Sequence, residues 1–186
     1  MYDFKQDMEC ILFDEAALNE TINDLAARID HDYYDRGRTL LAIPVLKGAI
    51  FFATALLQKL KTPVEIDFVS ASSYRDTAES GNLTISALPQ RDDWAKIDVL
   101  LIEDIVDTGN TLSAMVRELK SLGADVRVVA LLDKPSRRMV NIAADYIGRE
   151  IPNAFVVGYG LDYAEKYRNL PYIGILRREI YETPNA

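Results

Sequence analysis

Cysteine, histidine and long apolar runs are scarce in this chain of 186 residues, and each scarcity excludes a class of protein. The single cysteine, Cys10, cannot close an internal disulfide, and one histidine leaves no Cys/His cluster for zinc. No apolar run approaches the roughly 20 residues of a membrane-spanning helix. The opening MYDFKQDMEC lacks the basic start and apolar core of a signal peptide. We therefore expect a cytoplasmic protein with no membrane partner.

Positive charge is also in short supply, because 21 lysines and arginines face 29 acidic residues and give a net charge of −8. Nucleic-acid-binding proteins usually present a basic face, so this balance argues against a nucleic-acid partner. A small anionic ligand is still compatible with the acidic background. It requires local cations, a helix N-terminus or a metal ion to offset that background.

Helical and strand patterns alternate along most of the chain. Apolar residues at three-to-four spacing predict amphipathic helices, and continuous apolar runs predict buried strands. Helices are expected within 12–33, 49–60 and 111–123, and strands within 39–46, 64–74, 79–87, 97–104, 125–134, 153–160 and 171–176. Pro44 falls inside one of these strands, where we expect an irregular point. The alternation implies a doubly wound, mostly parallel α/β sheet with helices on both faces.

The length suits one well-filled domain rather than two, and no linker or low-complexity tract divides the chain. We predict a single domain, 1–186, whose core spans about 36–147. The segments 1–35 and 148–186 fall outside the strand–helix alternation. They are predicted to build a small hood subdomain.

Three carboxylates follow one buried apolar run in the segment VLLIEDIVDTGNTL, residues 99–112. Glu103 and Asp104 end the predicted strand, and Asp107 opens the loop that follows. Ligands of open α/β sheets bind beyond the carboxyl ends of the strands. Crowded carboxylates repel one another and are costly to bury, so a cation or a cation-carrying ligand is expected here. Glu103 and Asp104 suit hydroxyl groups or a hard cation such as Mg²⁺.

The loop after the acidic pair is suited to a phosphate. Gly109 permits unusual backbone angles, and Thr108 and Thr111 offer hydroxyls and a possible N-cap. Successive backbone N–H groups from Asp107 through Asn110 are positioned to cradle an anion, helped by the helix dipole. A solvated strand end with a capped helix is the simpler interpretation of DTGNT alone. The two acids before it favour a ligand site.

The whole segment is similar to the signature of the type I phosphoribosyltransferases, which use phosphoribosyl pyrophosphate (PRPP). Four apolar residues, two acids, two apolar residues and D-T/S-G-x-T make a long and specific pattern. The resemblance implies that loop 107–111 binds the 5′-phosphate, and that Glu103 and Asp104 contact the ribose hydroxyls directly or through Mg²⁺. It implies that Asp107 hydrogen-bonds purine N7 and assists proton removal.

Two further segments resemble the hypoxanthine-guanine branch of that family. VLKGAIFF resembles its pyrophosphate-binding turn, which implies a pyrophosphate site at Lys47 and Gly48 and a cis peptide between Leu46 and Lys47. Arg168 is implied to bind pyrophosphate as well. ASSYRDTAESG resembles the mobile loop that closes over the reaction, and its leading residues are Ser72, Ser73 and Tyr74.

The segments LLDKPSRR and IPNAFVVGYGLDYAEKYRNLPYIG concern the base. By resemblance, Lys134 donates to the purine 6-oxo group and Phe155 stacks on the ring. Backbone atoms near Val156 and Asp162 are implied to read the 2-position, and Asp162 to help bind a second Mg²⁺. Lysine donates hydrogen bonds but accepts none, so a 6-oxopurine should be preferred over adenine.

The resemblance covers roughly 45–176, with the motifs in matching order. It implies a purine salvage enzyme that transfers the phosphoribosyl group of PRPP to hypoxanthine and/or guanine, and that forms a homodimer or homotetramer. One alternative is a related enzyme that prefers xanthine. A second is a regulatory protein of the same fold that senses PRPP, and a third is an α/β domain with a merely decorated strand end.

Overall fold

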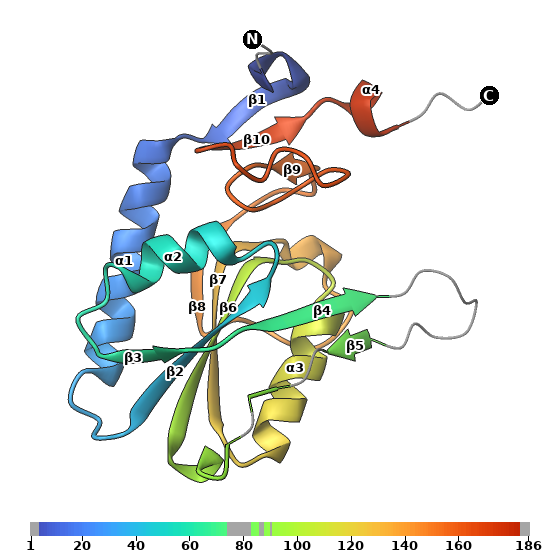
Figure 1. Cartoon of the computed structure of the whole chain (residues 1–186). Helices are drawn as coiled ribbons and strands as arrows, with labels where there is room; N and C mark the ends of the chain where they lie inside the picture. The colour runs from blue at the N-terminus through green and yellow to red at the C-terminus, as the bar shows by residue number, and fades with distance from the viewer. Residues whose placement is uncertain (1–3, 74–82, 86–87, 90, 183–186) are drawn as a thin grey trace.

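The computed structural model describes residues 4–73, 83–85, 88–89 and 91–182 (Figure 1). Its strands are β1 (Met8–Phe13), β2 (Thr39–Leu46), β3 (Val64–Ile66), β4 (Val69–Ser73), β5 (Leu83–Ile85), β6 (Ile97–Val106), β7 (Asp125–Asp133), β8 (Tyr146–Glu150), β9 (Val156–Val157) and β10 (Ile173–Leu176). Its α-helices are α1 (Glu15–Tyr33), α2 (Ile50–Leu57), α3 (Asn110–Ser121) and α4 (Arg178–Tyr181). Short 3₁₀ helices are η1 (Phe4–Asp7), η2 (Trp94–Lys96) and η3 (Pro135–Arg137).

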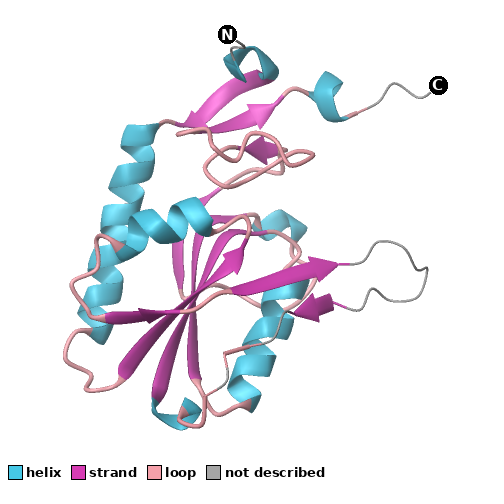
Figure 2. Cartoon of the chain, viewed as in Figure 1, coloured by secondary structure: helices cyan, strands magenta, loops and turns pink. Residues whose placement is uncertain are grey.

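The main sheet has seven strands in the order β5-β4-β2-β6-β7-β8, with β3 also paired to β2. All of its pairings are parallel except that of β4 with β5. Helices α1 and α2 cover one face and α3 covers the other (Figure 2). The doubly wound, mostly parallel α/β fold is thereby confirmed.

Burial on both faces explains the continuous apolar runs of the central strands. In β2, Leu40 and Ala42 pack under α1 and α2, whereas Leu41 and Ile43 face the cluster that contains α3. A strand with two buried faces needs apolar residues at every position, not at every second one. The pattern therefore marks β2, β6 and β7 as the centre of the sheet.

Helix α1 forms where its spacing predicted. The Asp14 side chain accepts a hydrogen bond from Ala17 N at 2.8 Å and caps the first turn. Leu18, Ile22 and Ile29 are buried along one stripe of the helix. Among the described residues, no helix is both long and apolar enough to cross a membrane.

Pro44 lies where the neighbouring pairing is interrupted. Strand β3 pairs with 40–42 of β2, and β4 pairs with Val45 and Leu46. Among the described strands, the pairing on this side of β2 is therefore broken at Ile43 and Pro44, while Pro44 pairs with Ile102 of β6 on the other side. A residue without an N–H is tolerated at such a gap, so the expected irregular point is confirmed.

A second, three-stranded sheet has the order β1-β10-β9 and joins the two ends of the chain. It lies above the carboxyl ends of the main strands, and the first and last described elements, η1 and α4, lie on this side (Figure 1). The segments predicted as a hood are thus shared between two sheets, because α1 and β8 pack with the main sheet. Strands β1 and β8 were not expected from the sequence.

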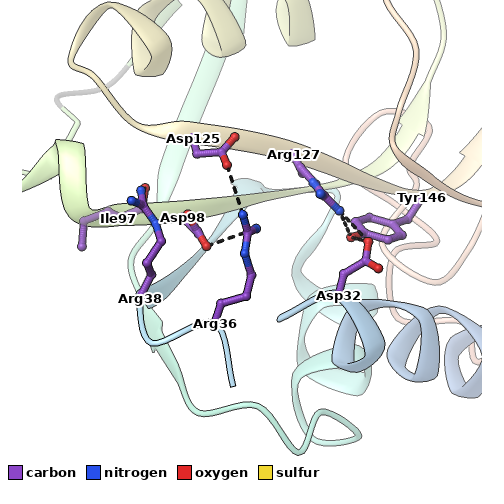
Figure 3. A network of polar contacts seen from close by, with 8 residues as sticks. All are labelled: Asp32, Arg36, Arg38, Ile97, Asp98, Asp125, Arg127 and Tyr146. Atoms are coloured by element: carbon purple, nitrogen blue, oxygen red, sulfur yellow. Dashed lines mark hydrogen bonds and ion pairs between the residues drawn. The ribbon is translucent and has the colours of Figure 1, made fainter. Parts of the chain in front are cut away.

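At the opposite end of the main sheet, Asp98 is the centre of a polar network (Figure 3). Asp98 is 1% exposed, and its carboxylate accepts a hydrogen bond from Arg38 Nε at 2.6 Å. Arg36 Nη1 lies 3.3 Å from the same carboxylate and also pairs with Asp125. Nearby, Arg127 and the Tyr146 hydroxyl both donate to Asp32. The network joins the start of β6 to the segment that precedes β2.

We expect Asp98→Ala to lower the free energy of unfolding by about 2–3 kcal/mol, because charged hydrogen bonds to a buried acceptor are lost. Urea denaturation measures this. The control Asp24→Ala removes a carboxylate that is 68% exposed and pairs with Arg28, and should change stability by at most about 0.5 kcal/mol. Equal losses in both variants would contradict the assignment.

Candidate active site

The acidic pair lies within the last part of β6, because the strand continues past Asp104 to Val106. Burial raises the pKa of Glu103 well above its usual range, and the charge of Asp104 adds to the rise. Burial also raises the pKa of Asp104 to about 6, although Ile105 N donates to its Oδ1 at 2.9 Å. Glu103 Oε2 is buried and has no hydrogen-bond partner among the described residues. A cation bound beside Glu103 and Asp104 would therefore stabilise their charged forms.

The turn between β2 and α2 packs directly against this pair. A Cβ added to Gly48 would lie 1.9 Å from Asp104 Oδ2, so a larger residue there would force the Asp104 side chain to move. On the other side, a Cβ added to Gly160 would lie 1.9 Å from Gly48 O. The Leu46–Lys47 peptide is cis, as the resemblance implied.

A cluster of charges joins this turn to the loop before β10. Lys47 Nζ lies 3.1 Å from Glu165 Oε2, and Arg168 Nη2 lies 3.4 Å from the same oxygen. Arg168 Nη2 also lies 2.9 Å from Asp162 Oδ1. Burial raises the pKa of Asp104, and the positive charge of Arg168 opposes that rise in part. Glu165 was missed at the sequence level, since only tertiary contact puts it between the two cations.

The loop that enters α3 differs from the expectation in its cap. The N-cap residue is Gly109, with a left-handed φ of 85°, and the helix start has no side-chain cap. The proposed caps Thr108 and Thr111 were therefore wrong, although Thr108 Oγ1 lies 3.5 Å from Asn110 N. A Cβ at Gly109 would lie 2.7 Å from Ile142, which adds a steric reason for glycine. Uncapped N–H groups at a helix start are suited to bind an anion.

Asp107 is held by two arginines that follow β7. Arg137 Nε lies 2.9 Å from Asp107 Oδ1 as an ion pair, and Arg138 Nη1 donates to the Asp107 carbonyl at 2.7 Å. Arg138 also pairs with Asp133. The Asp107 carboxylate is thus partly exposed, and its ion pair with Arg137 orients it. Neither arginine had been singled out from the sequence, because the DKPSRR segment is 30 residues away along the chain.

One cavity of about 710 Å³ opens beside Asp107 and extends under the small sheet. Its lining includes every residue that the resemblance assigned to the base together with the proposed proton acceptor: Asp107, Lys134, Phe155, Val156 and Asp162. Ile105 and Leu161 add apolar walls, and Glu9, Arg178 and Tyr181 line it from the terminal segments. A concave cavity with convergent polar groups is a usual form of a small-molecule site, and this one has a largely polar and charged lining.

Lys134 is buried in the cavity wall at 8% exposure. Its Nζ donates to Ala154 O at 2.6 Å, and its backbone N donates to Val106 O. Burial lowers the pKa of Lys134, while the nearby Asp107 carboxylate acts in the opposite direction. The ammonium has three donors, so two are left for a ligand.

Other predicted site residues lie apart from the cavity or outside the described chain. Ser72 and Ser73 lie in β4, and Tyr74 lies outside the described residues. Among the described residues, no three Asp, Glu, His or Cys side chains converge as a ready-made metal cluster. Glu103 and Asp104 therefore form a pair, and Asp162 lies on the loop opposite them.

The fold and this site define the class of type I phosphoribosyltransferases: a doubly wound sheet with two acids at a strand end and an uncapped loop entering the next helix. The chain belongs to the phosphoribosyl transferase domain family, whose model matches residues 11–164.

Several known proteins are similar over nearly the whole chain. The hypoxanthine-guanine phosphoribosyltransferase of Bacillus subtilis is 44% identical over 182 residues, covering 96% of this chain and 99% of that protein. The bifunctional protein TilS/HprT of Listeria monocytogenes is 49% identical over 180 residues, but the chain spans only 27% of its length. A crystal structure of a Staphylococcus aureus hypoxanthine phosphoribosyltransferase matches with a TM-score of 0.88 and 39% identity, covering 96% of each chain.

Proposed function

We propose that this protein is a purine salvage enzyme. It transfers the phosphoribosyl group of PRPP to hypoxanthine and/or guanine and yields IMP or GMP and pyrophosphate. The observation that carries the proposal is the single cavity in which Asp107, Lys134 and Phe155 meet, next to the acidic strand end. The names of the relatives from Bacillus subtilis and Staphylococcus aureus support the same reaction.

PRPP would bind across the ends of β2 and β6. Loop 107–111 would hold the 5′-phosphate with its uncapped N–H groups, and Glu103 and Asp104 would face the ribose hydroxyls. Lys47, Gly48 and Arg168 would receive the pyrophosphate. The two cations are paired with Glu165 in the ligand-free protein, so the incoming pyrophosphate would replace a carboxylate partner.

The acidic pair fits Mg²⁺. Glu103 Oε2 is buried and has no hydrogen-bond partner in the described part of the chain. Both carboxyls have raised pKa values, and a hard cation would stabilise their charged forms. Mg²⁺ usually takes one or two protein carboxylates and completes its shell with phosphates and water. Glu103 and Asp104 would hold one ion, and Asp162 would help hold a second. When bound, Mg²⁺ neutralises the pyrophosphate as a Lewis acid and template.

The purine would lie against Phe155, with its 6-oxo group at Lys134 and its 2-position near the backbone of Val156 and Asp162. In the reaction, a purine nitrogen forms a bond to ribose C1 as the bond from C1 to pyrophosphate breaks, and the leaving group takes the electron pair. Asp107, close to N7, would assist removal of the purine proton. The carboxylates of β6 would stabilise the positive charge that develops on the sugar.

A direct product assay tests the proposal. The purified protein is mixed with PRPP and Mg²⁺ and offered hypoxanthine, guanine, xanthine or adenine in separate reactions. We expect nucleotide from hypoxanthine or guanine, loss of product on chelation of the metal, and no product from adenine. Preferential use of xanthine would favour the related enzyme. PRPP binding without turnover of any base would favour a regulatory protein.

Three expectations from the sequence stay predictions within this proposal. They are closure of the loop led by Ser72, Ser73 and Tyr74, assembly as a homodimer or homotetramer, and a cytoplasmic location. Sedimentation at several protein concentrations would determine the assembly state.

A further inference from the structure

The C-terminal helix α4 contributes an aromatic ring to the base cavity. The rings of Tyr181 and Phe155 are stacked, with centroids 4.7 Å apart and planes inclined by 21°. Tyr163 meets Phe155 edge-on, with centroids 5.7 Å apart and planes inclined by 87°. Phe155 nevertheless keeps 37% of its surface exposed and lines the cavity. The ring is therefore held on two sides while part of it faces the cavity.

Helix α4 is fixed to the small sheet, so the position of Tyr181 is set by the fold. The residue before the helix, Arg177, donates its backbone N to Asp7 O at 2.9 Å and its Nε to Gln6 O at 2.9 Å. Ile180 and Tyr181 pack on the cluster of buried residues in the small sheet. These contacts bring a residue from the end of the chain to the side of Phe155.

From this geometry we infer that Tyr181 is a positioning residue for the purine. It covers one face of Phe155 and holds that ring in the orientation in which its other face receives the base. Stacked aromatic pairs favour offset parallel planes, so a ring held by a partner presents a defined plane to a planar ligand. The inference rests on the proposed transfer to a purine base, and it adds a residue that does not itself touch the reacting atoms.

The same geometry admits an opposite interpretation, in which the Tyr181 ring occupies the place of the base. The two interpretations predict opposite changes in the KM for the base. If Tyr181 positions Phe155, its removal weakens base binding. If Tyr181 occupies the base site, its removal strengthens it.

The experiment compares Tyr181→Leu, Tyr181→Phe and the wild type in steady-state kinetics. Leucine keeps apolar contact with the small sheet but offers no ring, whereas phenylalanine keeps the stack. We expect Tyr181→Leu to raise the KM for hypoxanthine about 3- to 10-fold, with the KM for PRPP and kcat unchanged. Tyr181→Phe should restore the wild-type KM. Tyr34→Ala, at an exposed tyrosine after α1, is the matched control and should leave both KM values unchanged.

A double-mutant cycle with Phe155→Leu tests whether Tyr181 acts through Phe155. In the Phe155→Leu background, Tyr181→Leu should add little to the KM for hypoxanthine, because the ring that it positions is gone. Additive effects would overturn the inference. So would a fall in the KM for hypoxanthine, no change, or equal changes in the KM for PRPP. A wild type that turns over no base would instead refute the proposed function, so the two failures are distinguishable.

Discussion

Asp107→Ala should lower kcat about 10²–10⁴-fold, the usual contribution of a well-placed general base. The carboxylate lines the base cavity and is oriented by Arg137, so it is in place to take the purine proton. Its side chain is 40% exposed, so its loss creates no buried cavity. Arg138 binds the Asp107 carbonyl, which alanine retains. Stability should therefore change little.

The measurement is kcat for hypoxanthine together with the melting temperature of each variant. Asp107→Asn is the informative companion, because it keeps the shape and hydrogen bonding but accepts no proton. Glu118→Ala, on the exposed surface of α3, controls for loss of an acidic side chain. If Asp107→Asn kept wild-type turnover, the proton-acceptor role would be wrong. If the melting temperature of Asp107→Ala fell steeply, the loss of activity would have a structural cause.

Asp104→Asn should make the ligand-free protein more stable at pH 7 while impairing its use of PRPP. The folded-state pKa of Asp104 is about 6, against an ordinary value of 3.8, chiefly because burial disfavours the charged form. A rise of this size corresponds to at most about 3 kcal/mol of unfolding free energy. Asparagine removes the charge, and its side-chain oxygen still accepts from Ile105 N.

The sign of the pH dependence follows from the direction of this shift. Because the folded state holds the Asp104 proton more tightly than the unfolded state, its stabilising effect is complete below pH 3.8 and is lost as the pH rises through about 6. The stability difference between Asp104→Asn and the wild type should therefore grow over that interval. Urea denaturation between pH 4 and pH 7 measures it. A constant difference, or a less stable variant at pH 7, would contradict the prediction.

Glu103→Gln is the matched variant. Burial and the Asp104 charge raise the pKa of Glu103, and its Oε2 lacks a hydrogen-bond partner among the described residues. The amide should likewise stabilise the ligand-free protein and weaken the use of Mg²⁺ and PRPP. We expect the variant to gain stability and lose activity, because the wild type gives up stability to hold these carboxylates ready for a ligand that carries cations.

Some features of the site followed from the sequence because they depend on neighbours along the chain. The apolar run that ends in Glu103 and Asp104 is continuous in sequence, and so is loop 107–111. Their place at a strand end could be predicted from periodicity alone. The cap at Gly109 was missed, because the sequence offers Thr108 and Thr111 as caps by residue type, and only the backbone angles show that the cap is Gly109.

Other features involve residues far apart in the chain. Three contacts had no signal in the local sequence. They are the contacts of Arg137 with Asp107, of Glu165 with Lys47 and Arg168, and of Tyr181 with Phe155. Lys134 and Phe155 were identified only through the resemblance. By residue type, Lys134 is a lysine that follows a strand, and Phe155 is one residue of an apolar run. Each contact depends on how two segments pack, and many packings satisfy the same hydrophobic pattern.

By itself, the sequence determined a doubly wound α/β sheet and an acidic strand end followed by an anion-suited loop, because periodicity and adjacency are local properties. Tertiary structure alone decided that Asp107, the lysine after β7 and the ring carried by α4 meet around one cavity. It also decided that the turn at Gly48 packs against Asp104, and that Glu103 Oε2 is buried with no hydrogen-bond partner among the described residues. Burial and long-range contact set the pKa values and orientations on which the chemistry depends, and neither is encoded in any one segment.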